Sequence, residues 1–124
     1  MYIPDSNIFI LAFSGSGQEK EFLTKVVNRG ELVLSVITVA EVLAKATSKE
    51  ERIFRDLMDR FPVLSVDLAV SEIAAEYRKS LSGKSKRIVL LDCFIAAQAR
   101  INKLTLATNN KSDFPMKDIK IISF

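Results

Sequence analysis

The sequence has no histidine, a single cysteine (Cys93), and only four glycines and three prolines among its 124 residues. Without histidine, zinc sites of the Cys/His kind are excluded, and so is serine or cysteine catalysis with a histidine base. The lone cysteine cannot form an internal disulfide. We interpret Cys93 as core packing because nothing near it in the sequence would stabilise a thiolate. Acid–base or metal chemistry in this chain must therefore use carboxylates.

Long apolar runs are also missing, since none approaches the roughly 20 residues that a membrane span needs. The first residues, MYIPDSN, have neither the basic stretch nor the apolar segment of a signal peptide. We therefore expect a soluble, cytoplasmic protein with no membrane partner. A hydrophobic content of 48% excludes a disordered chain, and the length fits one domain, residues 1–124. The net charge of +3 permits nucleic-acid binding but is too small to indicate it.

Short apolar runs of strand length alternate along the chain with stretches of helical period. One helical stretch, 18–30, ends at a glycine, and another, 66–83, is predicted to turn Leu68, Ile73, Ala74, Tyr77 and Leu81 inward. This alternation predicts an α/β sandwich around a mostly parallel sheet. In such sheets ligands bind beyond the carboxyl ends of the strands. The predicted strands are 2–3, 32–36, 61–66, 104–107 and 119–123.

Four acidic residues lie next to predicted strands, and each has a local explanation. Asp5 follows the first strand and could cap the next helix. Glu41 stands three residues after Thr38, the spacing of a capping box. Asp92 opens a helix that is apolar on nearly every side and could be its N-cap. Asp113 closes the polar segment TNNKSDF, whose asparagines and aspartate suit a turn. Taken singly, none of the four indicates a site.

Taken together, the four acids are expected to converge if the first strand is central in the sheet. Clustered carboxylates repel one another and raise one another's pKa values unless a cation neutralises them. Oxygen ligands without histidine or cysteine favour a hard divalent ion, Mg²⁺ or Mn²⁺. Such an ion polarises a phosphoryl group and generates hydroxide at neutral pH. The constellation therefore predicts metal-dependent phosphodiester hydrolysis.

Four blocks of sequence, in order and spanning nearly the whole chain, carry a resemblance to a known family. They are YIPDSNIFI, LSVITVAEVL, LLDCFIAAQA and LTLATNNKSDF. With these blocks the chain resembles the PIN-domain ribonucleases, and most of all the VapC-type toxins of toxin–antitoxin pairs. The resemblance implies a PIN-like three-layer α/β/α sandwich, endoribonuclease activity on RNA, a homodimer, and a cognate antitoxin that covers the acidic groove.

The resemblance also assigns roles to individual residues. Ser6, where the family usually has threonine, would orient the acidic cluster, and Asn110 would lie near the metal or the scissile phosphate. Pro4 and Asn109 depart from the family pattern, the first weakening the opening strand and the second removing an expected phosphate contact. The acids that would bind the metal are Asp5, Glu41, Asp92 and Asp113.

The RNA would need nearby cations, because phosphates approach an acidic cluster only if metal and flanking charges reverse the local sign. The sequence offers the basic stretch GKSKR before the Asp92 helix, although such a run can also be a solvated loop. Two other functions remain open: a non-catalytic RNA-binding or protein-interaction module, and a phosphoacceptor receiver domain. The receiver domain needs an acidic pair after its first strand, and PDSN supplies one acid. The candidate RNA contacts are Lys84, Lys86, Arg87 and Lys111.

Overall fold

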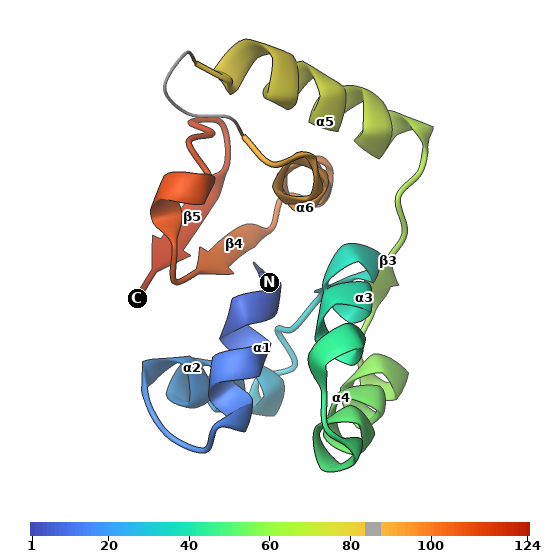
Figure 1. Cartoon of the computed structure of the whole chain (residues 1–124), viewed down its shortest axis with the longest axis vertical. Coiled ribbons are helices and arrows are strands. Elements are labelled where there is room, and N and C mark those ends of the chain that lie inside the picture. Colours follow the sequence, from blue (N-terminus) through green and yellow to red (C-terminus); the bar gives the residue numbers. More distant parts are fainter. Residues whose placement is uncertain (84–87) are drawn as a thin grey trace.

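The computed structural model describes residues 1–83 and 88–124, and its strands are all parallel to their neighbours (Figure 1). One sheet has the order β1 (Tyr2–Pro4), β4 (Thr105–Thr108), β5 (Lys120–Ser123). A second pair joins β2 (Leu34–Ser35) to β3 (Val63–Leu64). The runs predicted as strands at 32–36 and 61–66 thus form only two-residue strands. The first is cut short because Ser35 caps the following helix, accepting a hydrogen bond from the Ile37 amide at 3.1 Å.

β1 is an end strand of its own three-stranded sheet, but hydrogen bonds hold it on both sides, so it lies centrally among the five strands, as the sequence predicts. On one side it pairs with β4, with Ile3 opposite Leu106. On the other, the Tyr2 amide donates to the Glu31 carbonyl at 2.8 Å, and the Val33 amide donates to the Tyr2 carbonyl at 2.9 Å. The segment that leads into β2 therefore lies beside β1, and the carboxyl ends of β1, β4 and β5 meet at one edge of the sheet, here called the carboxyl edge.

Six helices of the described residues connect these strands, and local sequence explains several of their ends. A capping box between Thr47 and Glu50 opens the helix that begins at Ser48, and the Asp67 side chain caps the helix that begins at Leu68. After α2 the chain turns at Gly30, whose φ of 67° lies in the left-handed region that glycine adopts without strain. The helices are α1 (Ser6–Phe13), α2 (Gln18–Asn28), α3 (Val36–Lys45), α4 (Ser48–Arg60), α5 (Leu68–Leu81) and α6 (Leu90–Asn102), with a short 3₁₀ helix, η1 (Lys111–Asp113).

Two hydrophobic clusters lie on opposite faces of the sheet. On one face Ile3 and Leu106 pack with buried residues of α5 and α6. On the other, Phe9 of α1 packs edge-to-face on Phe54 of α4, with ring centroids 5.2 Å apart, among residues of α2 and α3. Figure 1 shows α5 and α6 on one side of the strands and α1, α2 and α4 on the other. The three-layer α/β/α sandwich is thereby confirmed.

The middle of the helix that carries Asp92 is buried as predicted, but Leu90, Leu91 and Ile101 near its ends are exposed, as is one residue of the preceding helix. In α6, Cys93 and residues 95–99 are buried. Leu68, predicted to face inward, is 74% exposed; it is the first residue of α5, directly after the N-cap Asp67. Ala74 and Tyr77 of the same helix are buried as predicted. Among the described residues, no helix is long and apolar enough to cross a membrane.

Candidate functional site

Asp5 lies at the carboxyl end of β1, where the backbone fixes it against the neighbouring strand. Its amide donates to the Ala107 carbonyl at 2.9 Å. Its carboxylate accepts from the Ile8 amide at 3.4 Å, so Asp5 is the N-cap of α1. The local explanation of Asp5 is therefore correct, but it is incomplete. The residue is only 7% exposed, and its second carboxylate oxygen accepts a bond from the Thr108 hydroxyl at 2.5 Å.

The electrostatic setting of Asp5 disfavours its charge. Burial raises the pKa of Asp5 above the ordinary aspartate value, and the negative charge of Glu41 raises it further. The hydrogen bonds from Thr108 and Ile8 act in the opposite direction without reversing the shift. Asp5 forms no ion pair within the described residues. A buried carboxylate with a second carboxylate nearby and no cation is a position where a positive ligand would be stabilising.

The segment TNNKSDF forms both a turn and a chain of hydrogen bonds that leads to Asp5. The Asn110 amide donates to the Thr108 hydroxyl at 3.0 Å, and this hydroxyl donates to Asp5. The Asn110 side-chain amide in turn donates to the Asp113 carboxylate at 2.7 Å. Asp113, half-buried at the end of η1, is thus connected to Asp5 through Asn110 and Thr108.

Thr108 was missed by the sequence reasoning, which assigned the orienting hydroxyl to Ser6. Ser6 is the half-buried first residue of α1, and its hydroxyl makes no hydrogen bond within the described part of the chain. Thr108 is fully buried at the end of β4. The available signal was its position directly after the apolar run 104–107, but only the pairing of β1 with β4 shows that this position faces Asp5.

Glu41 does not belong to a capping box, so the local explanation of this residue is wrong. The N-cap of α3 is Ser35, so Thr38 and Glu41 both lie inside the helix. Glu41 is half-buried, and its charge acts on Asp5. Thr38, one turn before it, is fully buried, and its hydroxyl has no hydrogen-bond partner among the residues that the structure describes. A buried polar atom without a partner is uncommon and is found at functional sites.

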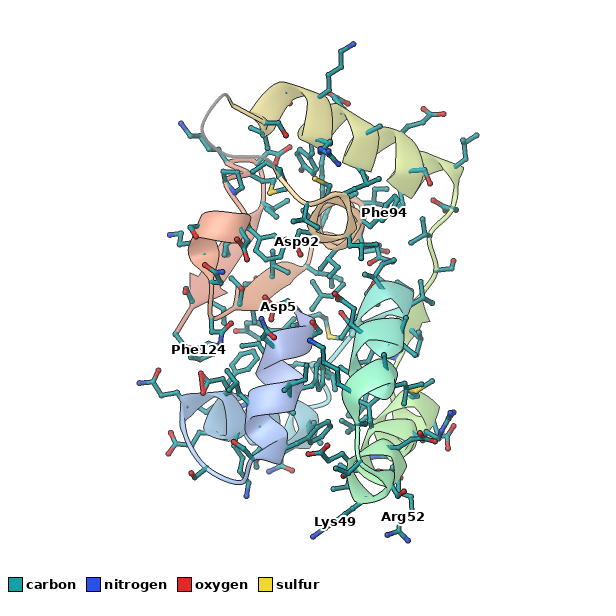
Figure 2. All side chains as sticks on the ribbon, viewed as in Figure 1. Asp5, Lys49, Arg52, Asp92, Phe94 and Phe124 are labelled. Carbon is teal, nitrogen blue, oxygen red and sulfur yellow. The ribbon has the colours of Figure 1, made fainter. Side chains whose placement is uncertain are left out.

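Asp92 is not the N-cap of α6, because that position is Val89 and Asp92 lies within the first turn. It is half-buried on a helix that contacts α3. Figure 2 shows Asp5 and Asp92 in the central part of the molecule, between α1 and α6. Burial, and then the charge of Asp92, raise the pKa of Cys93 to about 11, so the thiol stays protonated and packs in the core as predicted.

Within residues 1–83 and 88–124, no three acidic or cysteine side chains lie close enough to hold one metal ion together. The residue types nevertheless fit a hard divalent cation. Asp5 and Glu41 interact electrostatically, and the Thr108 hydroxyl contacts Asp5. Carboxylate and hydroxyl oxygens are the ligands that Mg²⁺ and Mn²⁺ prefer. A cation would also remove the cost of the uncompensated charge on Asp5. The candidate ligands are Asp5, Glu41, Asp92 and Asp113.

The predicted RNA contacts divide into two groups. Lys111 is exposed in η1, two residues before Asp113. It therefore lies on the loop that follows β4 at the carboxyl edge. Lys84, Lys86 and Arg87 lie outside the described residues.

Comparison with known proteins gives one family and a consistent set of relatives. The profile described as PIN domain matches residues 2–120. Ribonuclease VapC10 of Mycobacterium tuberculosis is 29% identical over 116 residues, which cover 94% of this chain and 87% of the relative. A toxin–antitoxin complex from Klebsiella pneumoniae is similar in structure, with a TM-score of 0.80 and 25% identity, covering 99% of this chain and 97% of the other. VapBC2 from Rickettsia felis shares the fold, with a TM-score of 0.80 at 20% identity, covering 99% and 98% of the two chains.

Proposed function

This chain belongs to the PIN domain family, and on that basis we propose that it is a metal-dependent endoribonuclease and the toxin of a toxin–antitoxin pair. The observation that carries the proposal is Asp5, a buried carboxylate at the carboxyl edge of the sheet that has a raised pKa and no ion-pair partner within the described residues. The similarity of this chain to a ribonuclease over 94% of its length supports RNA as the substrate. The compartment that we propose for this activity is the cytoplasm.

The proposed ligands of the ion are Asp5, Glu41, Asp92 and Asp113, with Asp5 and Asp92 making the direct contacts. When bound, Mg²⁺ or Mn²⁺ would neutralise a phosphate oxygen and lower the pKa of a bound water. The protein's own part is to orient the carboxylates that hold the ion. Thr108 fixes one oxygen of Asp5 and leaves the other to the Ile8 amide, which restricts rotation of the carboxylate. Asn110 donates hydrogen bonds to both Thr108 and Asp113 and so restricts the Asp113 carboxylate as well.

Charge around the site decides whether RNA can approach. We propose that Lys111, together with Lys84, Lys86 and Arg87, contacts the RNA backbone, because phosphates need flanking cations beside an acidic cluster. Lys111 is exposed on the same loop as Asp113, which supports this role.

A protein partner is supported by an open cleft on the side of the molecule formed by α1, α2 and α4. The cleft has a volume of about 420 Å³ and is lined by apolar side chains that include Phe13, Leu23, Ile53 and Leu57. Apolar surface of this kind is typical of protein interfaces. Solved relatives are toxin–antitoxin complexes, and we propose that a segment of an antitoxin docks here, as well as over the acidic groove. We also propose a homodimer, for which exposed Val89, Leu90 and Leu91 at the start of α6 provide apolar surface.

RNA cleavage with and without added Mn²⁺ or Mg²⁺ tests the proposed activity. We expect that the wild type cleaves RNA when the metal is present and that a chelator abolishes this cleavage. The double variant Asp5→Asn/Asp92→Asn should not cleave RNA. Undiminished cleavage by the double variant would contradict the proposed site. Failure of the wild type to bind either ion at millimolar concentration would favour the alternative, a non-catalytic RNA-binding or protein-interaction module on the same fold.

A further inference from the structure

Three aromatic rings form a row on the face of the sheet that α1 and α2 cover. Tyr2 of β1 and Phe22 of α2 meet edge-to-face, with centroids 5.4 Å apart and planes at 86°. Phe22 meets Phe124 with centroids 5.1 Å apart and planes at 62°. Tyr2 and Phe22 are half-buried, whereas Phe124 is 39% exposed. The row therefore runs from the sheet toward solvent and ends at the Phe124 ring.

The end of this row lies at the carboxyl edge, where Asp5 is. Phe124 directly follows β5, and its amide donates to the Thr108 carbonyl at 3.3 Å. Thr108 is the residue whose hydroxyl donates to Asp5. Asp5 follows β1, Thr108 ends β4, and Phe124 follows β5, so the backbones of Asp5 and Phe124 are separated by two strand spacings, about 10 Å. The Phe124 side chain turns to the face opposite the Thr108 hydroxyl that donates to Asp5, so a strand that reaches both residues would cross the carboxyl edge between them.

The Phe124 ring is held in place but not enclosed. Side chains alternate along a strand, so Phe124 points to the face opposite that of Ser123, the partner of Thr108 in the sheet. Its contact with Phe22 follows from this direction. An edge-to-face contact covers at most one face of the Phe124 ring. Phe9 and Phe54, which belong to the hydrophobic cluster on this face of the sheet, are by contrast fully buried. Phe124 therefore combines a fixed orientation with access from solvent.

We propose that the Phe124 ring is a stacking platform for a nucleobase of single-stranded RNA, one or two nucleotides from the phosphate that is cleaved. Proteins that bind single strands without reading their sequence combine cationic groups with aromatic rings on which bases stack. Here Lys111 supplies an exposed cation on the loop after β4, and Phe124 supplies the ring directly after β5, the neighbouring strand. Unstacked bases of single strands are the usual target of such rings. This subsite rests on the proposed ribonuclease activity and adds a reason for preferring single-stranded RNA.

The test measures binding of a fluorescently labelled, single-stranded RNA whose cleavage position has been mapped with the wild type. Binding is measured in the Asp5→Asn background, which keeps the RNA intact, with Phe124→Ala and Phe124→Leu as the variants. Loss of one stacked base should weaken binding by about 5- to 150-fold. Phe124→Leu preserves an apolar contact with Phe22 but has no aromatic face, so it should lose nearly as much, and Phe124→Trp should retain affinity. Leu68→Ala, which truncates an exposed apolar side chain at the start of α5, is the matched control and should bind as the parent does.

A second measurement identifies the stacked base. An abasic nucleotide is placed in turn at each position around the cleavage site. At one position, the abasic RNA should bind the parent protein as weakly as the intact RNA binds the Phe124→Ala variant. The Phe124→Ala variant should bind this abasic RNA no more weakly than it binds the intact RNA. In steady-state cleavage by otherwise wild-type protein, the loss should appear mainly in KM and little in kcat.

The outcomes separate this inference from the function on which it rests. If the wild type cleaves RNA but Phe124→Ala and Phe124→Leu, both folded by thermal unfolding, bind as tightly as the parent, the platform is wrong and the nuclease stands. The platform would also be wrong if, at every abasic position, the loss of binding affinity added to the loss caused by Phe124→Ala. If the wild type neither binds nor cleaves RNA, the proposed function fails and the platform fails with it.

Discussion

Two aspartates at opposite edges of the sheet show how differently a carboxylate can be held. Asp118 lies two residues before β5, at the amino edge, and is surrounded by partners. It accepts a hydrogen bond from the Tyr77 hydroxyl at 2.7 Å and lies 3.6 Å from the guanidinium of Arg100. Asp5, at the carboxyl edge, is far more buried, accepts bonds from a hydroxyl and an amide, and has another carboxylate, Glu41, acting on it.

The comparison separates a structural carboxylate from one that is suited to bind a cation. Asp118 has its countercharge, and together with Tyr77 and Arg100 it ties α5 and α6 to the segment before β5. Burial and the bond to Asp118 raise the pKa of Tyr77 well above its ordinary value, so its hydroxyl remains a donor at neutral pH. Asp5 has no ion pair inside the described residues. Uncompensated, buried charge of this kind marks functional sites more often than structural ones.

The largest effect should come from making the same substitution at both aspartates. Asp5→Asn should lower the rate of RNA cleavage by about 100-fold or more, because the loss of a metal-binding charge removes several kcal/mol of transition-state stabilisation. Asp118→Asn should leave the rate within about twofold and lower thermal stability instead, since it loses its ion pair with Arg100. Single-turnover cleavage and thermal unfolding of both variants measure this. Equal losses of activity would show that the contrast between the two edges has no functional meaning.

A smaller effect is expected where the charge remains but its support is removed. Thr108→Val deletes the hydroxyl that donates to Asp5 and accepts from Asn110, while keeping the size of the side chain. Loss of such a supporting hydrogen bond typically costs about 10- to 100-fold in activity or metal affinity. Thr108→Ser keeps the hydroxyl and should retain most of the cleavage rate. If the valine and serine variants cleave equally well, Thr108 does not position Asp5.

Asp113 should matter less than Asp5 or Asp92 among the acids. It is half-buried at the end of η1, and its hydrogen bond to Asn110 connects it to Asp5 through Thr108. Asp113→Asn keeps an oxygen that can accept from Asn110, so the loop should keep its shape. We expect a measurable loss of cleavage under saturating Mn²⁺ that is smaller than the loss in Asp5→Asn. A larger loss would place Asp113 among the direct ligands.

The sequence was a good guide to the architecture and to the neighbourhood of the acids. The alternation of apolar runs and helical stretches predicted the parallel sheet, and the order of elements predicted that β1 is central. Asp5 was predicted both as an N-cap and as a site residue, and the N-cap is observed. These predictions succeed because periodicity and capping act over a few residues and can be read locally.

The errors have two sources: a helix start that was placed at the wrong residue, and contacts between distant segments that have no local signal. Thr38 and Glu41 have the spacing of a capping box, but Ser35 begins the helix, because the strand before it ends sooner than its apolar run. The hydroxyl on Asp5 comes from Thr108, 103 residues away, and only the pairing of β1 with β4 brings it there. The bond between Tyr77 and Asp118 spans 41 residues and had no local signal.

The smallest expected effect tests the electrostatics of Asp5 without RNA. In metal-free protein, Asp5→Asn should be more stable than the wild type at neutral pH, because the asparagine can still cap α1 but carries no buried charge. The folded-state pKa of Asp5 is raised, so between the ordinary value of 3.8 and the raised value the folded protein binds more protons than the unfolded protein. The stability of the wild type relative to Asp5→Asn therefore falls as pH rises through this window. The difference should vanish as pH falls toward 3.8.

Adding Mn²⁺ should reverse the order of stability at neutral pH. A ligand that binds only the folded protein stabilises it by about 2.7 kcal/mol at 100 times its dissociation constant. The wild type should gain this stability, whereas Asp5→Asn, with a weakened site, should gain less. Thermal unfolding in chelator and in Mn²⁺ across a pH series measures both effects, with Asp118→Asn as the control that should respond to the metal as the wild type does. If chelated Asp5→Asn is less stable than the wild type at every pH, then the hydrogen bonds from Thr108 and Ile8 outweigh burial, and Asp5 is a structural residue like Asp118.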